Sequence, residues 1–445
     1  MGGRRAVRAL RNAQPETSLV QDMTPEGQGI VTVAGKRVFV DGAMTGELVS
    51  FRRVRARRNY DEAQLLAVAE PSADRVAPKC RYFGVCGGCA LQHLSAEAQL
   101  RLKAAVLAEN LRRIGRVEPA RWLPPVSGPA WGYRRRTRLS VREVSGKGRV
   151  LVGFSERNSG YVTDMLGCET LHPAVARLIE PLSHLIGDLS LKRQVPQVEA
   201  VVAGNATLLL LRVLAEPDGA DLDRLRGFRD EHRIRVMLQR AGPDDLRGLD
   251  AAIDEGDLWY ELPEQGLRMG FSPADFIQVN QDVNRRMIGL AVELLGLERS
   301  MRTLDLYCGI GNFTLPMARQ VSYVLGLEGD ARAVARARAN AHSNNIGNAE
   351  FRSADLAGTE AGAALAGERF DAVLLDPPRA GAAQMLGPIS AAGASRVLYV
   401  SCHPGTLARD AGVLVHDLKY RLVAAGILDM FPATTHVESV ALFER

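Results

Sequence analysis

The chain has 445 residues, of which 46% are hydrophobic and 24% are charged. This profile is typical of a folded globular protein and excludes disordered and collagen-like chains. At roughly 150 residues per domain, the length predicts about three domains. The formal net charge is only +5, so the overall charge is weak evidence for a polyanionic partner.

Neither a membrane span nor a secretory signal is expected. No stretch approaches the roughly 18 uninterrupted apolar residues that a spanning helix needs. Near the N-terminus, spaced arginines stand where a secretory signal would need an apolar core: Arg4, Arg5, Arg8 and Arg11. We therefore expect a cytoplasmic protein.

Basic residues cluster at two further places. One cluster comprises Arg52, Arg53, Arg55, Arg57 and Arg58, and the other comprises Arg134, Arg135, Arg136 and Arg138. Such densities suit contacts with nucleic-acid phosphates, although solvated strand faces are an alternative. We expect the first cluster to lie where a strand ends.

Residues 12–72 are expected to form a small β-barrel. Short β-rich runs (GIVTV, RVFV, ELVSF, QLLAVA) alternate there with turn signals such as Ala34-Gly35-Lys36. Small barrels of the oligonucleotide-binding (OB) kind present one sheet face and its loops to nucleic acid. Residues 73–265 follow as a central α+β domain, which contains a helix from Ser95, a candidate N-cap, to Ile114 before Gly115.

Residues 266–445 repeat the order apolar strand, turn, helix. The strands run into TLDLYCGIG, YVLGLEGD, EFRSADL, FDAVLLDPPR and RVLYVSCHP. This rhythm predicts an α/β, Rossmann-like domain with a doubly wound parallel sheet.

The first of these strands ends in a glycine-rich turn, Tyr307 to Asn312, that suits a nucleotide-like ligand. A dinucleotide fingerprint would continue with a third glycine, but Thr314 stands there, and no phosphate-binding lysine follows. Acidic residues end the next three strands, at Glu328, Asp355 and Asp376. A cationic sulfonium, as in S-adenosyl-L-methionine (SAM), suits that edge better than a pyrophosphate, although each acid alone is also compatible with a strand-end cap.

Cys402 follows the fifth strand and is expected at the same sheet edge. It is bracketed by Ser401 and His403 at a loop start, where a depressed pKa would raise the thiolate fraction. A buried, inert cysteine is the alternative. A SAM pocket, a nucleophilic thiol and basic surfaces together favour methylation of a pyrimidine carbon 5, because thiolate addition to carbon 6 makes carbon 5 nucleophilic and a base then removes its proton.

From about residue 16 onward, the sequence resembles the RNA uracil-5-methyltransferases that act on 23S ribosomal RNA, of the RlmD type. The stretches that carry the resemblance are FSPADFIQVN at 271–280, LDLYCGIGNFTLP at 304–316, LLDPPRAG at 374–381, YVSCHPGTLARD at 399–410 and LDMFPATTHVES at 428–439. The resemblance implies a TRAM-like barrel, a central domain with an iron–sulfur cluster and a C-terminal SAM-dependent methyltransferase domain. It also implies that the target uridine is flipped out of its RNA context.

By this resemblance, Cys402 is the nucleophile and Glu438 the base, with His436 as an alternative base. The residues that would line the SAM and uracil pocket are Gln278, Tyr307, Asn312, Glu328, Asp355 and Asp376.

Four further cysteines form a candidate metal site. Cys80, Cys86 and Cys89 have the spacing C-x5-C-x2-C, and Cys168 is the remaining partner once Cys308 and Cys402 are assigned to the cofactor and catalytic loops. Four thiolates allow either zinc or a [4Fe-4S] cluster. The resemblance favours the cluster, in a structural role because methyl transfer needs no redox step.

The resemblance also favours 23S rRNA as the partner over transfer RNA, since the transfer-RNA relatives lack both the barrel and the cysteines, and we expect a monomer. Three alternatives stay open: the same chemistry on another RNA, methylation of cytosine carbon 5, and a non-catalytic RNA-binding assembly factor.

Overall fold

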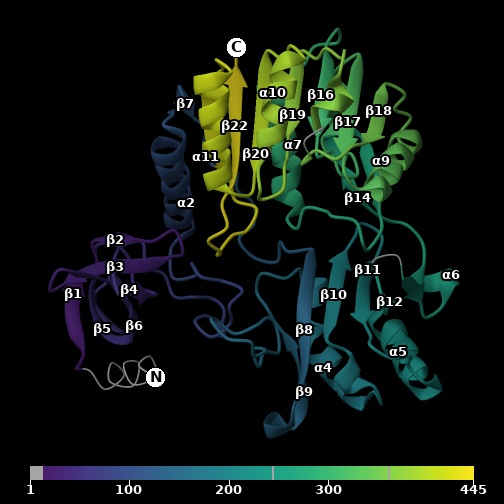
Figure 1. Cartoon of the computed structure of the whole chain (residues 1–445). Coiled ribbons are helices and arrows are strands. Elements are labelled where there is room, and N and C mark those ends of the chain that lie inside the picture. The colour runs from purple at the N-terminus through teal and green to yellow at the C-terminus, as the bar shows by residue number, and fades with distance from the viewer. Residues whose placement is uncertain (1–13, 243–244, 359–360) are drawn as a thin grey trace. The chain divides into compact units, whose positions relative to one another are not determined.

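The computed structural model describes residues 14–242, 245–358 and 361–445 (Figure 1). The N-terminal arginines Arg4, Arg5, Arg8 and Arg11 and the first residues of the predicted barrel range lie outside these residues. Two compact units make up the chain. Residues up to 103, 155–161 and 431–435 form the first unit, and residues 104–154, 162–430 and 436–445 form the second.

A β-barrel fills most of the first unit. Its strands are β1 (Glu16–Leu19), β2 (Asp22–Met23), β3 (Gln28–Val33), β4 (Lys36–Asp41), β5 (Leu48–Ala56) and β6 (Tyr60–Glu70), in the order β1-β5-β6-β4-β3-β2. The edge strands β1 and β2 are consecutive in the chain, so the segment that contains both closes the sheet on itself. Between them, Val20 N–H donates to the Glu47 carbonyl and Gln21 N–H to the Ile30 carbonyl, both at 2.8 Å.

Side chains along these strands point alternately into and out of the barrel, so every second side chain is buried. Val31, Val38, Val49 and Phe51 are each 0% exposed and form the barrel core. The predicted turn between β3 and β4 is confirmed, because Ala34 and Gly35 both have positive φ, 49° and 78°, as a tight hairpin with right-handed twist requires.

The first arginine cluster lies at the end of a strand, as predicted. β5 ends at Ala56, so Arg52, Arg53 and Arg55 lie in its last five residues, and Arg57 and Arg58 directly follow it. Arg53 pairs with Glu16 at 2.8 Å and with Asp61 at 2.7 Å, side chains brought from distant strands by the sheet. Part of this positive charge is therefore neutralised inside the barrel.

The predicted helix from Ser95 is confirmed in outline. Helix α2 covers Ala96–Asn110 and continues as a π-helical turn, Leu111–Gly115. The Ser95 hydroxyl accepts a hydrogen bond from Ala98 N–H at 3.2 Å and so caps the first turn.

The second unit begins with a mixed six-stranded sheet in the order β13-β12-β11-β10-β8-β9. Its strands are β8 (Arg136–Val144), β9 (Arg149–Gly153), β10 (Gln197–Val202), β11 (Thr207–Arg212), β12 (Arg235–Gln239) and β13 (Leu246–Gly248). The helices of this region are α3 (Pro173–Ala176), α4 (Ile179–Asp188), α5 (Gly219–His232) and α6 (Ala251–Asp254). A hairpin of β14 (Leu258–Leu262) and β15 (Leu267–Phe271) follows.

The second arginine cluster is also partly internal. Arg136 donates to the carbonyl of Pro273 at 2.8 Å and to that of Asp275. Arg138, further along β8, pairs with Glu199 at 2.9 Å. Arg136 therefore links the six-stranded sheet to the segment after β15, which corrects its expected use in phosphate binding.

The largest sheet has the order β18-β17-β16-β19-β20-β22-β21-β7. Its strands are β7 (Arg121–Trp122), β16 (Arg302–Leu306), β17 (Tyr323–Glu328), β18 (Ala349–Ser353), β19 (Ala372–Leu375), β20 (Arg396–Ser401), β21 (Arg421–Leu428) and β22 (Glu438–Glu444). The associated helices are α7 (Gln281–Leu295), α8 (Thr314–Ala318), α9 (Ala331–Ser343), α10 (Ala383–Ala391) and α11 (Pro404–Gly412).

The five strands predicted from the sequence, β18 to β20 in sheet order, are parallel as expected, and further strands that were not predicted extend the sheet. β22 runs antiparallel to both β20 and β21. The short connection at 429–437 allows only this hairpin, because a parallel return needs a crossover of about a dozen residues or more. Strand order reverses between β16 and β19, and open α/β sheets bind ligands at the carboxyl ends of strands at such a reversal.

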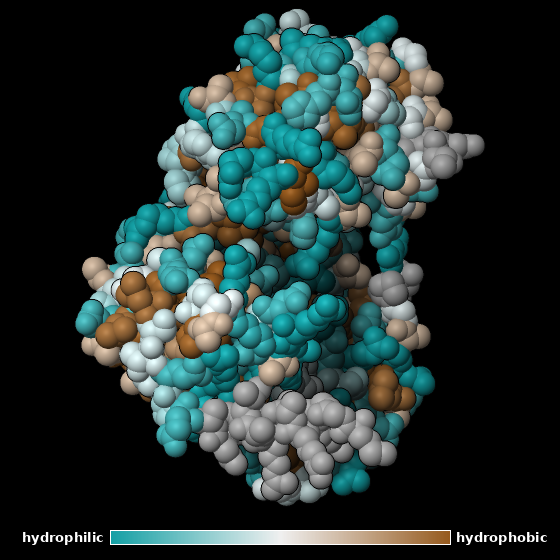
Figure 2. Space-filling model, turned by 60° about the vertical axis from the view of Figure 1, so that its left-hand side comes forward, coloured by the Kyte–Doolittle hydropathy of each residue, from teal (hydrophilic) through white to brown (hydrophobic). Residues whose placement is uncertain are grey.

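Hydrophilic side chains cover much of the face seen in Figure 2, and hydrophobic residues appear there in separate patches. Among the described residues, no helix is both long and apolar enough to span a membrane.

Candidate active site

The turn after β16 brings backbone amides to the point where the strand order reverses. Tyr307, Gly309 and Gly311 have φ values of 64°, 53° and 92°, a conformation that favours glycine. Tyr307 N–H is held by the Leu327 carbonyl at 2.8 Å, so the non-glycine residue is fixed in this conformation by the neighbouring strand. The predicted glycine-rich turn therefore has the geometry expected of a close approach to a ligand.

Glu328 and Asp355 both hold backbone amides of nearby turns. Glu328 is the last residue of β17, and its Oε2 accepts a hydrogen bond from Gly309 N–H at 3.1 Å. Asp355 comes two residues after β18 ends, and its Oδ1 accepts from Ala357 N–H at 3.0 Å and Gly358 N–H at 3.2 Å. The contact to Gly309 joins β17 to the glycine-rich turn, whereas Asp355 stabilises only its own turn.

Two carboxyl groups near this edge have raised pKa values. Asp376 directly follows β19, and burial raises the pKa of its carboxyl to about 7. Burial also raises the pKa of Asp305, within β16, to about 7; a hydrogen bond from Thr314 opposes this rise, and the charges of Asp376 and Glu328 add to it. Thr314 Oγ1 donates to Asp305 Oδ2 at 2.5 Å, while Oδ1 has no partner among the described residues.

Sequence analysis did not single out Asp305. The available signal was a carboxylate inside the otherwise apolar strand TLDL, an arrangement that is costly without a compensating contact.

Cys402 and Glu438 meet through the register of two antiparallel strands. Ser401 at the end of β20 pairs with Ser439 in β22. Cys402 directly follows Ser401 and Glu438 directly precedes Ser439, so each lies one residue beyond this pair. Besides burial, the negative charge of Glu438 raises the pKa of the Cys402 thiol, so the two side chains interact electrostatically. Both residues are partly buried. The sheet therefore brings the predicted nucleophile and the predicted base together, although they are far apart in sequence.

The thiol of Cys402 has a raised pKa. Burial is the main cause, and the negative charges of Glu438 and Asp376 act in the same direction, while the positive charge of Arg379 opposes them. His403 is the N-cap of α11, and its Nδ1 accepts a hydrogen bond from Thr406 N–H at 3.2 Å.

His436 is less suited than Glu438 to act as a base. Its Nδ1 lies 3.3 Å from a guanidinium nitrogen of Arg379. Because an arginine only donates hydrogen bonds, Nδ1 must be the acceptor, which occupies the lone pair of the neutral ring. Arg379 therefore contacts His436 and also lowers the pKa of Cys402.

Gln278 and Asn312 come from segments on either side of α7. Gln278 is partly buried and lies two residues before Asn280, the N-cap of α7, whose Oδ1 accepts from Val283 N–H at 3.3 Å. The side chain of Asn312 is bound by Tyr260 and Asn284, so its role includes fixing the turn after β16. Neither Tyr260 nor Asn284 was predicted from the sequence, since each lies in an unremarkable apolar or helical context.

The four candidate metal ligands are divided between the two units, Cys80, Cys86 and Cys89 in the first and Cys168 in the second. In the described part of the chain, no group of three or more His, Cys, Asp or Glu residues is arranged to hold a metal ion. The sulfur of Cys86 accepts from Gly88 N–H at 3.4 Å, and that of Cys168 lies 3.2 Å from the Thr170 hydroxyl. Four thiolates are nevertheless the donor set that a structural zinc site or an iron–sulfur cluster requires.

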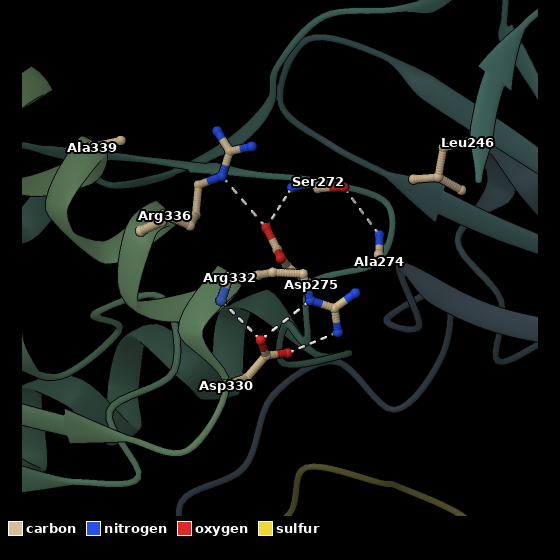
Figure 3. Close-up of a pocket in the computed structure, with 9 residues that line it drawn as sticks. Leu246, Ser272, Ala274, Asp275, Asp330, Arg332, Arg336 and Ala339 are labelled. Carbon is tan, nitrogen blue, oxygen red and sulfur yellow. Dashed lines mark hydrogen bonds and ion pairs between the residues drawn. The ribbon is translucent and has the colours of Figure 1, made fainter. Parts of the chain in front are cut away.

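Two cavities beside α9 have volumes of about 490 Å³ and 580 Å³. In the first, Asp330 pairs with Arg332 at 2.9 Å, and Asp275 pairs with Arg336 at 3.5 Å (Figure 3). Trp259, in the second, lies under the Arg268 guanidinium, 4.3 Å from the ring centre. The charged groups thus find partners within the protein, and none of the predicted site residues lines either cavity.

Known proteins resemble this chain over its whole length. The family model described as tRNA (Uracil-5-)-methyltransferase matches residues 261–445. The 23S rRNA (uracil(1939)-C(5))-methyltransferase RlmD of Methylococcus capsulatus is 46% identical over 443 residues, covering 100% of both chains. RlmD of Cupriavidus necator is 48% identical over 419 residues, covering 92% of this chain and 95% of its own.

A solved structure has the same fold. The tRNA (uracil-54, C5)-methyltransferase of Pyrococcus abyssi, in complex with S-adenosyl-L-homocysteine, matches with a TM-score of 0.74 and 24% identity, covering 96% of this chain and 100% of that one. The two RlmD relatives are 46% and 48% identical to this chain over nearly its whole length. The chain therefore belongs to the family of RlmD-type 23S rRNA (uracil-C(5))-methyltransferases.

Proposed function

We propose that the chain transfers a methyl group from SAM to carbon 5 of a uridine in 23S rRNA. The observation that supports the proposal is that Cys402 and Glu438 flank the last pair of the β20–β22 ladder and that the charge of Glu438 acts on the Cys402 thiol. Family membership supports the substrate, since the relatives are named for uracil 1939 of 23S rRNA. We assign the target as the equivalent uridine.

Cys402 forms the covalent bond to the RNA in the proposed reaction. Its thiolate adds to carbon 6 of the uracil ring, and the resulting enolate makes carbon 5 nucleophilic. Bound SAM supplies the methyl group to carbon 5 and leaves as S-adenosyl-L-homocysteine. Glu438 then takes the proton from carbon 5, which re-forms the ring double bond and expels the thiolate of Cys402.

The remaining predicted residues line the SAM and uracil pocket in this proposal. The glycine-rich turn offers the backbone of Tyr307 to Asn312, with Glu328 beside it, and Asp355 follows the next strand. Asp376 follows β19, and its charge acts on Cys402. We therefore assign Asp376 and Gln278 to the uracil side, and Tyr307, Asn312, Glu328 and Asp355 to the SAM side.

Mapping of 5-methyluridine tests the substrate. Ribosomal RNA from cells with and without this protein is digested and analysed by mass spectrometry, and the purified protein is supplied with SAM and 23S rRNA. We expect one 5-methyluridine in 23S rRNA that depends on the protein. Methylated cytidine would favour a cytosine-5 methyltransferase, and 5-methyluridine in another RNA would favour the same chemistry on that RNA. The absence of any product would favour a non-catalytic RNA-binding assembly factor.

The raised pKa of Cys402 predicts that covalent addition accelerates with pH. Burial and the charges of Glu438 and Asp376 disfavour the thiolate, so the reactive fraction rises about tenfold per pH unit from neutrality up to the raised pKa. Arg379 stabilises the thiolate, and Arg379→Gln should therefore move the profile to higher pH. The rate of adduct formation with 5-fluorouridine RNA measures both effects, and a profile that is flat or falls over this interval would contradict them.

We also propose that Cys80, Cys86, Cys89 and Cys168 hold a structural [4Fe-4S] cluster. The support is the thiolate donor set and the spacing, since such clusters are held by four cysteines. Protein purified without oxygen should contain four iron and four sulfide ions and absorb visible light, and Cys86→Ser should lose both. Stoichiometric zinc in colourless protein would reverse the assignment. No step of methyl transfer passes through this site.

A further inference from the structure

The side-chain amide of Asn312 is fixed by a buried hydrogen-bond network. Its Oδ1 accepts from the Tyr260 hydroxyl at 2.9 Å and from Asn284 Nδ2 at 3.1 Å, and its Nδ2 donates to Asn284 Oδ1 at 2.9 Å. Tyr260 and Asn284 are only 9% and 3% exposed, so water cannot readily replace a lost partner. Hydrogen-bond networks of this kind hold the side chains that they join in one arrangement.

The network joins three segments that are distant in sequence. Tyr260 lies in β14, Asn284 in the first turn of α7, and Asn312 at the end of the glycine-rich turn after β16. Helix α7 begins directly after the segment that contains Gln278, which we assign to the uracil pocket. The hydrogen bonds therefore connect the turn assigned to SAM with the helix that follows the uracil side of the pocket.

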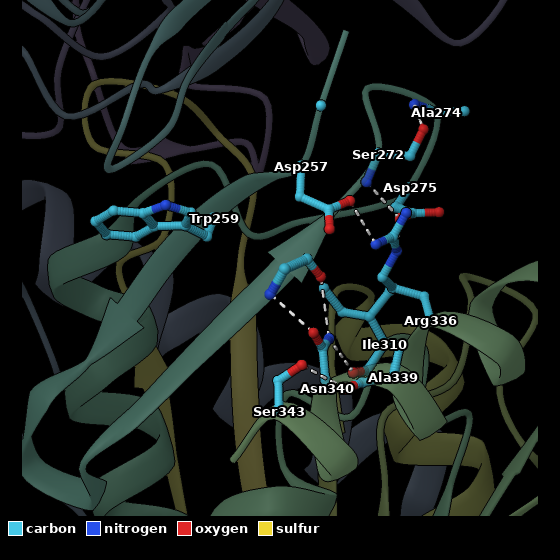
Figure 4. Close-up of polar contacts among 12 residues, drawn as sticks. Asp257, Trp259, Ser272, Ala274, Asp275, Ile310, Arg336, Ala339, Asn340 and Ser343 are labelled. Atoms are coloured by element: carbon cyan, nitrogen blue, oxygen red, sulfur yellow. Dashed lines mark hydrogen bonds and ion pairs between the residues drawn. The ribbon is translucent and has the colours of Figure 1, made fainter.

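A second amide holds the same turn from α9. Asn340 Nδ2 donates to the Ile310 carbonyl at 3.1 Å and to the Gly270 carbonyl at 3.0 Å, and its Oδ1 accepts from Gly270 N–H at 2.8 Å. Figure 4 shows this side chain between the end of β15 and Ile310. β14 thus contacts the glycine-rich turn directly through Tyr260, and β15 is linked to the turn through Asn340.

We propose that Tyr260 and Asn284 are positioning residues that act through Asn312 to hold the SAM-binding turn in its ligand-binding shape. The proposal rests on the function assigned above. Methyl transfer is sensitive to such placement, because an error of about 1 Å between reacting groups can cost about 10²-fold in rate. Neither residue has to touch SAM or RNA for this role.

The first test measures binding of S-adenosyl-L-homocysteine by calorimetry. Tyr260→Phe removes one hydroxyl and keeps the ring, and it should weaken binding about tenfold, which corresponds to about 1.4 kcal/mol. The matched control is Tyr323→Phe, which also removes one tyrosine hydroxyl bond, to Glu350 at 2.6 Å on an exposed part of the eight-stranded sheet. This control should bind with wild-type affinity.

A double-mutant cycle separates positioning from general destabilisation. Because Tyr260 acts through Asn312, Tyr260→Phe should add little to the loss that Asn312→Ala already causes. The affinity of Tyr260→Phe for 23S rRNA, measured without S-adenosyl-L-homocysteine, should equal that of the wild type. Partial unfolding would instead lower the affinities for both S-adenosyl-L-homocysteine and 23S rRNA. The proposal is overturned if Tyr260→Phe binds like Tyr323→Phe, or if the two losses simply add.

The nucleoside-binding measurement stays informative if the proposed function fails. Wild-type protein that binds S-adenosyl-L-homocysteine but does not methylate 23S rRNA would refute the substrate assignment alone. In that case, the comparison of Tyr260→Phe with Tyr323→Phe still decides the role of the network.

Discussion

Replacing Cys402 with alanine is expected to abolish methylation of 23S rRNA. The methyl acceptor, carbon 5 of uracil, becomes nucleophilic only after a thiolate has added to carbon 6, and alanine cannot form that bond. Loss of the nucleophile in a covalent enzyme lowers the rate on the order of 10⁶-fold, so activity should fall below detection. Transfer of a labelled methyl group from SAM measures the effect.

An adduct assay with 5-fluorouridine RNA locates the linkage directly. Fluorine at carbon 5 prevents the final proton removal, so wild-type protein should remain bonded to the RNA on a denaturing gel, and Cys402→Ala should not. Cys308→Ala is the matched control, because Cys308 is also a cysteine of this region but is only 4% exposed within the glycine-rich turn, and the variant should still form the adduct. An adduct at any residue other than Cys402 would refute the proposed mechanism.

Glu438→Gln is expected to separate the two halves of the reaction. Glutamine nearly preserves the shape of the side chain but cannot accept the carbon-5 proton, so methylation should slow by about 10² to 10⁴-fold. Addition of Cys402 and methyl transfer precede this step, and the protein should therefore accumulate as a covalent complex with natural, methylated RNA. The denaturing gel and a single-turnover methylation assay measure the two effects.

The other end of β22 supplies the control for Glu438. Glu444→Gln makes the same chemical change at a surface position, where Glu444 pairs with Arg396 at 3.1 Å. It should methylate at nearly the wild-type rate and accumulate no adduct. If Glu438→Gln instead turned over normally, the base would have to be another group, and His436→Gln would be the next variant to test.

Most of the elements that carry the site could be predicted from local patterns. Apolar runs and turn residues indicated the strands β16 to β20. Glycine at 309 and 311 indicated the turn after β16. Both are local features, because the backbone conformation of such segments depends mainly on neighbouring residues in the sequence. The antiparallel β21–β22 hairpin was not predicted from these patterns. Its direction depends on the length of the connection and on pairing with β20.

The pKa of Cys402 and the ion-pair partners of the arginines could not be predicted from the sequence. The raised pKa of Cys402 depends on burial and on Glu438 and Asp376, residues contributed by two other strands. The same limit applies to Arg53, whose partner Glu16 could not be identified before the barrel was known. Charge pairing is decided by distances in space, and these are set only when the sheets assemble.

The sequence alone determined which residues are available for chemistry: a thiol after the fifth strand of the C-terminal sheet, a carboxylate near the C-terminus and a glycine-rich turn. Tertiary structure alone decided that the thiol and that carboxylate flank the same strand pair, that the pKa of the thiol is raised, and that Tyr260 and Asn284 bind Asn312. The physical reason is that strand register and buried hydrogen bonds join segments that are far apart in the chain, whereas sequence patterns report only on neighbours.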